Sequence, residues 1–291
     1  MRRTALALLA SPLFVLAACG APTDGGGADP AEPEADATTP VASCDRDALE
    51  TMTEGTLTIG TDNPAYEPWF VDNDPSNGEG FESAVAYAIA ERMGFAQDEV
   101  TWVDVPFNNA VAPGPKNFDF DVNQISISDE RRQAVDFSSG YYDVRQVVIT
   151  TEGSAIADAG SVADLENARL GAQVGTTSYT AITDLVQPSQ QPNAFDTNDL
   201  AVQALQNGQI DGIVVDLPTA FYMTAAQLEN GTIVGQLPEV GGQAEQFGAV
   251  LDLNSPLTAC VTEAVDALRE DGTLDDLERQ WLSDQGAPEL Q

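Results

Sequence analysis

The sequence contains no histidine, a single lysine and little positive charge. Lysine and arginine together number 11 against 47 aspartates and glutamates, and the formal net charge is -36. Without histidine, the chain cannot form a Ser-His-Asp triad or a histidine metal site, and we predict no metal site and no cofactor. Binding to a nucleic-acid backbone requires clustered lysine and arginine, so nucleic acid is excluded as a partner.

Long apolar runs are absent after the N-terminus, since no later segment approaches 18 continuous apolar residues. Residues 1–18 place Arg2 and Arg3 before an apolar run and small residues, which predicts a secretory signal peptide. The ending Leu16-Ala17-Ala18-Cys19-Gly20 resembles the bacterial lipobox. This resemblance implies cleavage before Cys19, a lipid on its sulfur, and an exported protein anchored to the cell membrane. The alternative is plain secretion, with Cys19 an ordinary residue.

A linker is predicted after the lipid, over residues 19–43. From residue 20 it is small, acidic and rich in proline and glycine, with Val41 as its one aliphatic side chain larger than alanine. Such a segment cannot bury enough apolar surface to order itself, so we expect a flexible tether to a globular body.

Cysteine is also scarce, and its odd number is informative. The three cysteines are Cys19, Cys44 and Cys260. If Cys19 carries a lipid, Cys44 and Cys260 remain to form a disulfide in an oxidising compartment. The alternative is two unpaired, buried thiols.

Strand and helix patterns alternate along the body, which favours α/β layers. Strands are predicted at 56–61, 100–105, 122–126, 144–150, 168–174, 211–215 and 247–253. Helices are predicted from Phe81 to a stop at Gly94, over 162–167, 176–186 and 219–228, and around Leu200, Ala204 and Leu205. Two more helices are predicted near the C-terminus, the first with Ser255 as N-cap and the second with a weak capping box of Thr273 and Asp276.

The segment after the predicted strand 122–126 indicates a binding function. It is expected to enter a helix whose first turn carries Arg131 and Arg132. A guanidinium can hold a carboxylate through two parallel hydrogen bonds, and open α/β sheets bind ligands beyond the carboxyl ends of their strands. The segment therefore predicts a site for a small carboxylate. The alternative is a surface helix on which Arg131 pairs with Asp129 or another acid.

A series of short motifs runs in order through residues 45–285. They are Gly60-Thr61-Asp62, Tyr66 with Pro68-Trp69, Gly80-Phe81-Glu82, Ser126-Ile127-Ser128 with Arg131, Asp136-Phe137-Ser138 with Tyr141-Tyr142, Gly175-Thr176-Thr177, Asp211-Gly212 with Asp216, and Ala267-Leu268 with Asp271-Gly272-Thr273-Leu274 and Trp281. Together they resemble the bacterial extracellular solute-binding proteins of family 3, which supply amino acids to ABC importers.

This resemblance implies an α/β fold of the two-lobe, periplasmic-binding-protein-like kind (type II). Two hinge strands, near 144–151 and 247–253, would join the lobes. Lobe 1 would comprise residues 44–149 plus 248–291, and lobe 2 residues 150–247.

The resemblance also implies which residues hold an amino acid. Arg131 and Ser126 would bind its carboxylate, together with Thr176 and Thr177 from the facing lobe, unless these two only cap a helix. Asp216 would bind the ammonium, unless it only caps the helix that contains Pro218. The ligand's side chain would contact Asp62, Tyr66, Phe107 and Gln124. For the two aromatic residues, ordinary packing in the core is the alternative.

The function implied is capture of an amino acid by hinge closure, without catalysis, by a monomer that docks on the membrane permease of an ABC importer. Asp62 favours a polar or cationic ligand. Gln124 stands where the family usually has a small residue, and Ala112-Pro113-Gly114-Pro115 interrupts what is normally a helix. The alternatives are an enzyme on the same scaffold, similar to cyclohexadienyl dehydratase, and a ligand sensor for a membrane partner.

Overall fold

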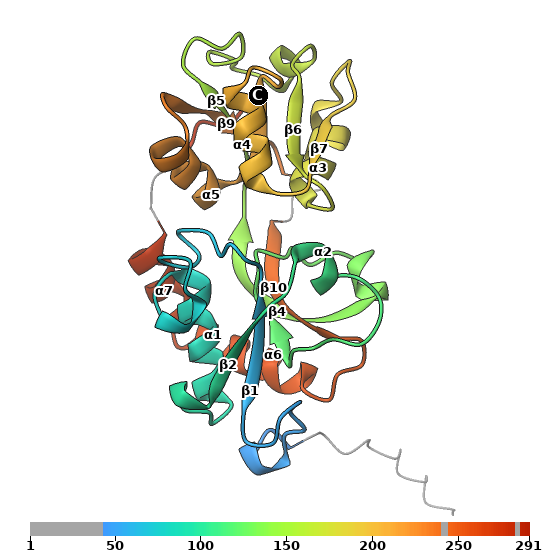
Figure 1. Ribbon diagram of the computed structural model, residues 1–291, viewed down its shortest axis with the longest axis vertical. Coiled ribbons are helices and arrows are strands. Elements are labelled where there is room, and N and C mark those ends of the chain that lie inside the picture. Colours follow the sequence, from blue (N-terminus) through green and yellow to red (C-terminus); the bar gives the residue numbers. More distant parts are fainter. Residues whose placement is uncertain (1–42, 240–243, 283–285) are drawn as a thin grey trace, which may run out of the picture. The chain divides into compact units, whose positions relative to one another are not determined.

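The computed structural model describes residues 43–239, 244–282 and 286–291 (Figure 1). The predicted signal peptide, Cys19 and residues 19–42 of the predicted linker lie outside these ranges. Among the described residues, no helix combines the length and the apolar character that a membrane span requires.

The first of two five-stranded sheets forms the core of one lobe. Its order is β2-β1-β3-β10-β4, with β1 parallel to β2 and β3, and β10 antiparallel to β3 and β4. The strands are β1 (Leu57–Thr61), β2 (Val100–Asp104), β3 (Phe120–Asp121), β4 (Val135–Val144) and β10 (Glu245–Asp252). The helices of this lobe are α1 (Phe81–Arg92), α2 (Phe107–Ala110), α6 (Thr258–Glu270) and α7 (Thr273–Trp281).

The apolar spacing of α1 explains how this lobe packs. Phe81, Val85 and Ile89 recur every four residues and are fully buried, as the sequence predicts. Trp69 packs edge-on against Phe81 and Phe247, with ring centroids 5.9 and 5.6 Å apart. This aromatic cluster supports the cavity described below.

A disulfide joins the start of the body to α6. Cys44 and Cys260 have Cα atoms 5.4 Å apart, and their bond closes a sequence separation of 216 residues. The two residues are therefore paired in the structure, as the cysteine count suggests.

The second sheet forms the core of the other lobe, in the order β7-β6-β8-β5-β9. Its strands are β5 (Gln146–Thr151), β6 (Leu170–Gln173), β7 (Asn193–Phe195), β8 (Gly212–Asp216) and β9 (Gly231–Gln236). Its helices are α3 (Thr177–Ala181), α4 (Asn198–Gln206) and α5 (Leu217–Tyr222). The first and last of these continue as π-helical turns, over Ile182–Val186 and Met223–Gln227.

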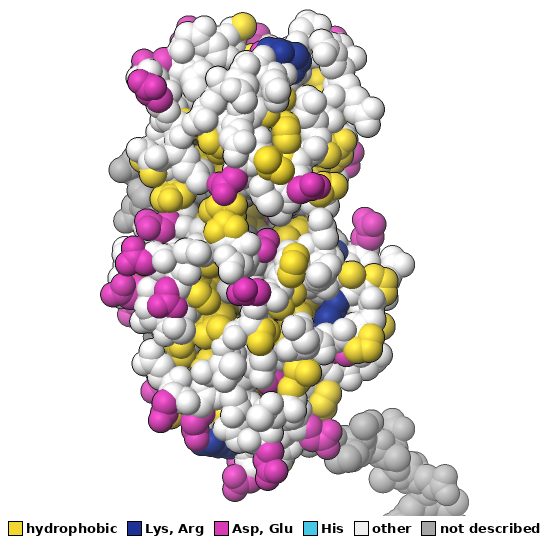
Figure 2. Space-filling model, in the orientation of Figure 1, with side chains coloured by type: hydrophobic (Ala, Val, Ile, Leu, Met, Phe, Trp, Pro, Cys, Tyr) yellow, Lys and Arg dark blue, Asp and Glu magenta, His cyan; other side chains and the backbone are white. Residues whose placement is uncertain are grey.

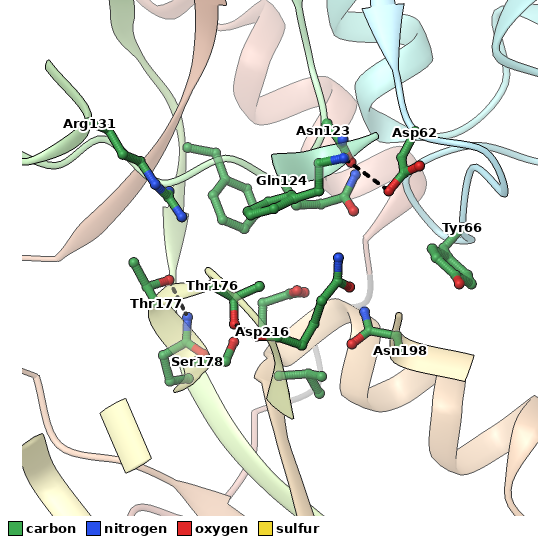
Figure 3. Close-up of a pocket in the computed structure, with 15 residues that line it drawn as sticks. Asp62, Tyr66, Asn123, Gln124, Arg131, Thr176, Thr177, Ser178, Asn198 and Asp216 are labelled. Atoms are coloured by element: carbon green, nitrogen blue, oxygen red, sulfur yellow. Dashed lines mark hydrogen bonds between the residues drawn. The ribbon is translucent and has the colours of Figure 1, made fainter. Parts of the chain in front are cut away.

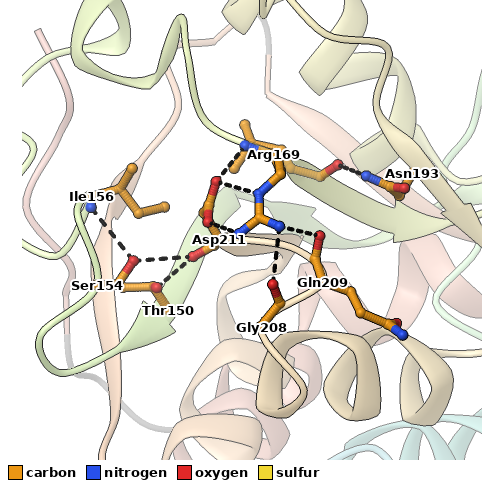
Figure 4. A network of polar contacts seen from close by, with 9 residues as sticks. Thr150, Ser154, Ile156, Arg169, Asn193, Gly208, Gln209 and Asp211 are labelled. Carbon is orange, nitrogen blue, oxygen red and sulfur yellow. Dashed lines mark hydrogen bonds and ion pairs between the residues drawn. The ribbon is translucent and has the colours of Figure 1, made fainter.

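An arginine network fixes the amino ends of two central strands of this sheet (Figure 4). Arg169, just before β6, donates from its backbone N and its Nε to Asp211, just before β8, over 2.8 and 3.1 Å. Its Nη1 donates to the carbonyls of Gly208 and Gln209. The network lies at the amino ends of β6 and β8, so it does not occupy their carboxyl ends, which line the cavity described below.

The chain changes from one sheet to the other slightly before each predicted lobe boundary. β4 ends at Val144 and β5 begins at Gln146 in the second sheet, ahead of the boundary predicted at 149. The return falls between β9 and β10, ahead of the boundary predicted at 247.

The last residues differ more from the prediction, which put them in lobe 1. Residues 286–291 instead lie beside β9, where Gln236 N donates to Pro288 O over 2.7 Å and Leu290 N to Gln236 O over 2.9 Å. Leu290 is buried in the core of the second lobe. The C-terminal segment therefore extends the second lobe, although α7 packs on α1 in the first.

Two local predictions around Arg131 are wrong. Residues 122–126 are not a strand: pairing ends at Asp121, and Ser126 forms only an isolated bridge with Phe247. The reason is the left-handed backbone of Gln124, whose φ of 48° interrupts an extended chain. The predicted helix after it is a single 3₁₀ turn, Arg131–Gln133.

The predicted caps of the C-terminal helices are also wrong. Leu257 is the N-cap of α6 and makes no side-chain cap, and Ser255 instead accepts a hydrogen bond from the N of Leu257. Gly272 is the N-cap of α7, and Thr273 donates to Asp271 rather than forming a capping box. The predicted helix 162–167 is a 3₁₀ turn, Val162–Leu165, and β4, β7, β9 and α2 were not predicted.

Candidate ligand-binding site

A cavity of about 50 Å³ lies where the carboxyl ends of β6 and β8 face the segment after β3 (Figure 3). Both lobes contribute to its wall, including β5 and β10, the strands at which the chain passes from one lobe to the other. The lining residues are Asp62, Tyr66, Phe107, Asn123, Gln124, Arg131, Gln146, Gln173, Thr176, Thr177, Ser178, Asn198, Val215, Asp216 and Phe247. All the ligand-contacting residues expected from the sequence are among them except Ser126. The Oγ of Ser126 lies 3.2 Å from that of Thr177, so it adjoins the cavity without lining it.

Arg131 extends from its 3₁₀ turn toward the facing lobe. Its Nη1 donates to the carbonyl of Ser126 over 2.6 Å, and its Nη2 to the carbonyl of Gly175 over 2.9 Å. Its guanidinium lies 5.5 Å from the ring centroid of Phe107. Arg131 takes part in none of the ion pairs among the described residues, so the alternative pairing with Asp129 is not formed.

Burial lowers the pKa of Arg131, with the Glu245 carboxylate opposing that shift. The group nevertheless stays charged, because a guanidinium does not lose its proton in proteins. A cation thus stands at the cavity wall with donors left over from the five that its guanidinium carries.

Thr176 and Thr177 open α3 opposite Arg131. Thr176 is the N-cap, and its Oγ1 accepts from the N of Tyr179 over 3.2 Å, so the capping alternative describes what this side chain does here. Thr177 points its hydroxyl toward Ser126 and toward the Nε2 of Gln146, 3.5 Å away.

Asp216 ends β8 and caps α5. Its Oδ1 accepts from the N of Thr219 over 3.0 Å, which is the capping role considered from the sequence. The residue also lines the cavity. Burial raises the pKa of Asp216 to about 6, because the charged form loses its water. A cation in the cavity would restore the charged form.

Asp62 and Tyr66 form the end of the cavity away from Arg131 (Figure 3). Asp62 accepts from the N of Asn63 over 2.7 Å and from the N of Phe107 over 3.3 Å, and burial raises its pKa. Burial also raises the pKa of Tyr66, as do the nearby Asp199 and Asp62 carboxylates. Phe107 is both a cavity residue and a member of an apolar cluster, so its packing alternative holds as well.

Gln124 lies between Arg131 and Asp62 in this view (Figure 3). The carboxylate of Glu82, which does not line the cavity, holds Gln124 in place. The backbone N of Gln124 donates to Glu82 Oε1 over 2.7 Å, its Nε2 donates to Glu82 Oε2, and the hydroxyl of Tyr141 donates to Glu82 Oε1. Glu82 is fully buried, and this burial raises its pKa to about 7.

Seven lining residues were not anticipated from the sequence. Gln173 and Val215 stand at the carboxyl ends of β6 and β8, where the strand-end rule could have found them. Asn198 opens α4, and Gln146 and Phe247 belong to strands at the change of sheet. Asn123 and Ser178 carried no signal beyond adjacency to an expected residue.

Direct hydrogen bonds join the two lobes around the cavity. Besides Arg131 to Gly175, the indole Nε1 of Trp69 donates to the Oγ1 of Thr219 over 2.9 Å in a buried contact. The two lobes are therefore in direct contact beside the cavity.

Known proteins share this architecture and part of the sequence. The family described as bacterial extracellular solute-binding proteins, family 3, matches residues 57–284, and the chain belongs to it. A probable histidine-binding protein of Campylobacter jejuni is 30% identical over 236 residues, covering 80% of this chain and 87% of that protein. The L-cystine-binding protein TcyJ of Escherichia coli is 26% identical over 229 residues, covering 78% and 83%.

Solved structures agree with the fold. An ancestral arginine-binding protein bound to arginine superposes with a TM-score of 0.65 at 28% identity, covering 79% of this chain and 99% of that one. The ancestral amino acid-binding protein AncCDT-1, a precursor of cyclohexadienyl dehydratase, gives 0.64 at 28% identity, covering 79% and 96%. The two-lobe α/β fold expected from the sequence is thereby confirmed.

Proposed function

We propose that this protein captures a free amino acid between its lobes and delivers it to the membrane permease of an ABC importer. One observation carries the proposal. Arg131 from the first lobe and Asp216 from the second line the same cavity. A cation and an anion at one small site match the carboxylate and the ammonium of an α-amino acid, and a buried charge without a partner costs several kcal/mol.

The remaining lining favours a polar or cationic side chain on the ligand. Asp62 and Tyr66 stand at the end of the cavity away from Arg131, and amide groups of Asn123 and Asn198 add to a polar wall. Asp62 supplies an anion that a cationic side chain can neutralise. The probable histidine-binding relative and the ancestral arginine-binding structure are consistent with this preference.

Closure of the lobes is the proposed capture step. Residues of both lobes line the cavity, so an amino acid enters when the lobes are apart. Two hydrogen bonds between the lobes would form as the lobes meet: the one from Arg131 to the carbonyl of Gly175 and the one from Trp69 to Thr219. A lipid on Cys19 and the linker 19–43 would hold the monomer at the membrane, outside the cytoplasm.

The direct test is the replacement Arg131→Ala, with ligand binding measured by calorimetry on protein unfolded and refolded to remove carried-over ligand. We expect the dissociation constant to rise at least about 100-fold, because the ligand's buried carboxylate loses its charged partner. Arg132→Ala is the matched control: the neighbouring arginine packs on Phe137 and does not line the cavity, so its loss should leave affinity within about twofold. Equal affinity of both variants would refute the assignment.

Catalysis on this scaffold is the second candidate, because AncCDT-1 is a precursor of an enzyme. The protein is proposed to bind without transforming its ligand. After prolonged incubation with the protein, mass spectrometry should therefore find the amino acid unchanged. More moles of converted product than of protein would favour an enzyme.

A further inference from the structure

The orientation of the Gln124 amide group is set by its neighbours. Both its backbone N and its side-chain Nε2 donate to the carboxylate of Glu82. An ionised carboxylate only accepts hydrogen bonds, so the NH₂ end of the amide must face Glu82. The Oε1 of Gln124 accepts no hydrogen bond from the described residues, and Gln124 lines the cavity. The amide therefore presents an acceptor to the ligand.

We propose that Glu82 is a positioning residue that sets ligand specificity, because it orients Gln124 so that the cavity accepts a side chain ending in hydrogen-bond donors. Glu82 itself does not line the cavity and would act on the ligand through Gln124. This inference rests on the proposed function and narrows it to a substrate class, namely amino acids whose side chains end in an ammonium or guanidinium group.

The surroundings of Glu82 make it a rigid support. It is fully buried in α1, and the hydroxyl of Tyr141 in β4 holds its Oε1. The other charged groups that face it are Asp121 of β3, also fully buried, and Asp216 of β8. Neither donates to Glu82 in the structure, and the donors that Glu82 holds are those of Gln124 and Tyr141. The left-handed backbone of Gln124, with φ of 48°, keeps this side chain against Glu82.

The replacement Glu82→Gln reverses the orientation with almost no change in shape. The new amide keeps its oxygen where Oε1 accepts from the Gln124 N and from Tyr141, and it places its NH₂ where Oε2 was. The amide of Gln124 must then turn its oxygen toward residue 82 and its NH₂ toward the cavity. The cavity would thereby exchange an acceptor for a donor.

L-arginine and L-citrulline are suitable probes, because their side chains have the same length. Arginine ends in a guanidinium that only donates hydrogen bonds, whereas citrulline ends in a ureido group whose carbonyl accepts them. At pH 8.5, where Glu82 is ionised, calorimetry on the wild type should show tighter binding of arginine. In Glu82→Gln the ratio of the citrulline dissociation constant to the arginine dissociation constant should fall about tenfold or more. A tenfold change corresponds to about 1.4 kcal/mol, the free energy of one mispaired hydrogen bond.

Two further variants separate orientation from general damage. Tyr141→Phe removes a different donor from Glu82 and should leave the ratio unchanged. Gln124→Gly, which suits the left-handed backbone, removes the oriented amide; the ratio should fall, and adding Glu82→Gln to it should change nothing more. If Glu82→Gln does not fold, the ratio in Gln124→Gly alone decides.

The outcomes are distinct. A wild type that binds no amino acid defeats the proposed function itself. A wild type that binds amino acids but does not prefer arginine to citrulline overturns the inference alone. The inference is also overturned if this ratio of dissociation constants is unchanged in folded Glu82→Gln, or if it falls equally in Tyr141→Phe.

Discussion

Acidification should weaken ligand binding through Asp216. Burial raises the pKa of Asp216 to about 6 in the structure, and an ammonium beside it would favour the ionised form and lower that pKa in the complex. The ligand therefore binds the ionised protein. Affinity should fall as pH drops below about 6, because a growing fraction of Asp216 must lose its proton before binding.

The size of the effect follows from that pKa. For a group with a pKa of about 6, roughly one site in eleven is ionised at pH 5, so the apparent dissociation constant rises about tenfold, or about 1.4 kcal/mol. Each further unit of acidification adds nearly another factor of ten. The ligand's own α-carboxylate and ammonium keep their charges across most of this range and contribute little.

The assay is calorimetric titration of one amino acid from pH 4.5 to pH 8, with circular dichroism to confirm that the protein stays folded. Asp216→Asn is the matched variant, because asparagine still caps α5 at the N of Thr219 but cannot ionise. It should bind more weakly at pH 7.5 and lose the dependence that begins near pH 6. A wild-type affinity that is constant down to pH 5, or the same slope in Asp216→Asn, would refute the reasoning.

Two predictions concern stability. Removing the disulfide with Cys44→Ser and Cys260→Ser together should lower the free energy of unfolding by up to about 5 kcal/mol in guanidinium titrations, because the bond closes a separation of 216 residues; Cys19→Ser should change it little. Leu290→Ala should cost about 2–5 kcal/mol by the same measurement, since this side chain is buried in the core of the second lobe, whereas the exposed neighbour Glu289→Ala should cost under about 0.5 kcal/mol. Equal effects at residues 289 and 290 would mean that the C-terminal segment is not packed as described.

Elements with a strong local pattern could be predicted from the sequence. Phe81, Val85 and Ile89 recur at helical spacing and form the buried face of α1, and the predicted strand at 56–61 contains β1. Where long-range contacts decide the backbone, the prediction was wrong. Gln124 ends the expected strand at 122–126 because Glu82, 42 residues away, holds both its backbone and its side chain.

The candidate site shows the same division. Asp216 and Gln173 follow apolar strands, so position at a strand end is a signal that the sequence contains. Gln146 and Asn198 have no such signal, and they line the cavity only because β5 and α4 bring them there. The C-terminal residues 286–291 likewise pair with β9 through backbone hydrogen bonds that no side-chain pattern announces.

The sequence by itself determined the exclusion of histidine chemistry and nucleic-acid binding, the alternation of strands and helices, and the three charged residues of the cavity. These depend on composition, local periodicity and ordered motifs. Only the tertiary structure decided that Arg131 spans from Ser126 to Gly175, that the C-terminus joins the second lobe, and that Glu82 orients Gln124. Each of these depends on distances between residues far apart in the chain, which are fixed by the packing of whole elements and not by any local pattern.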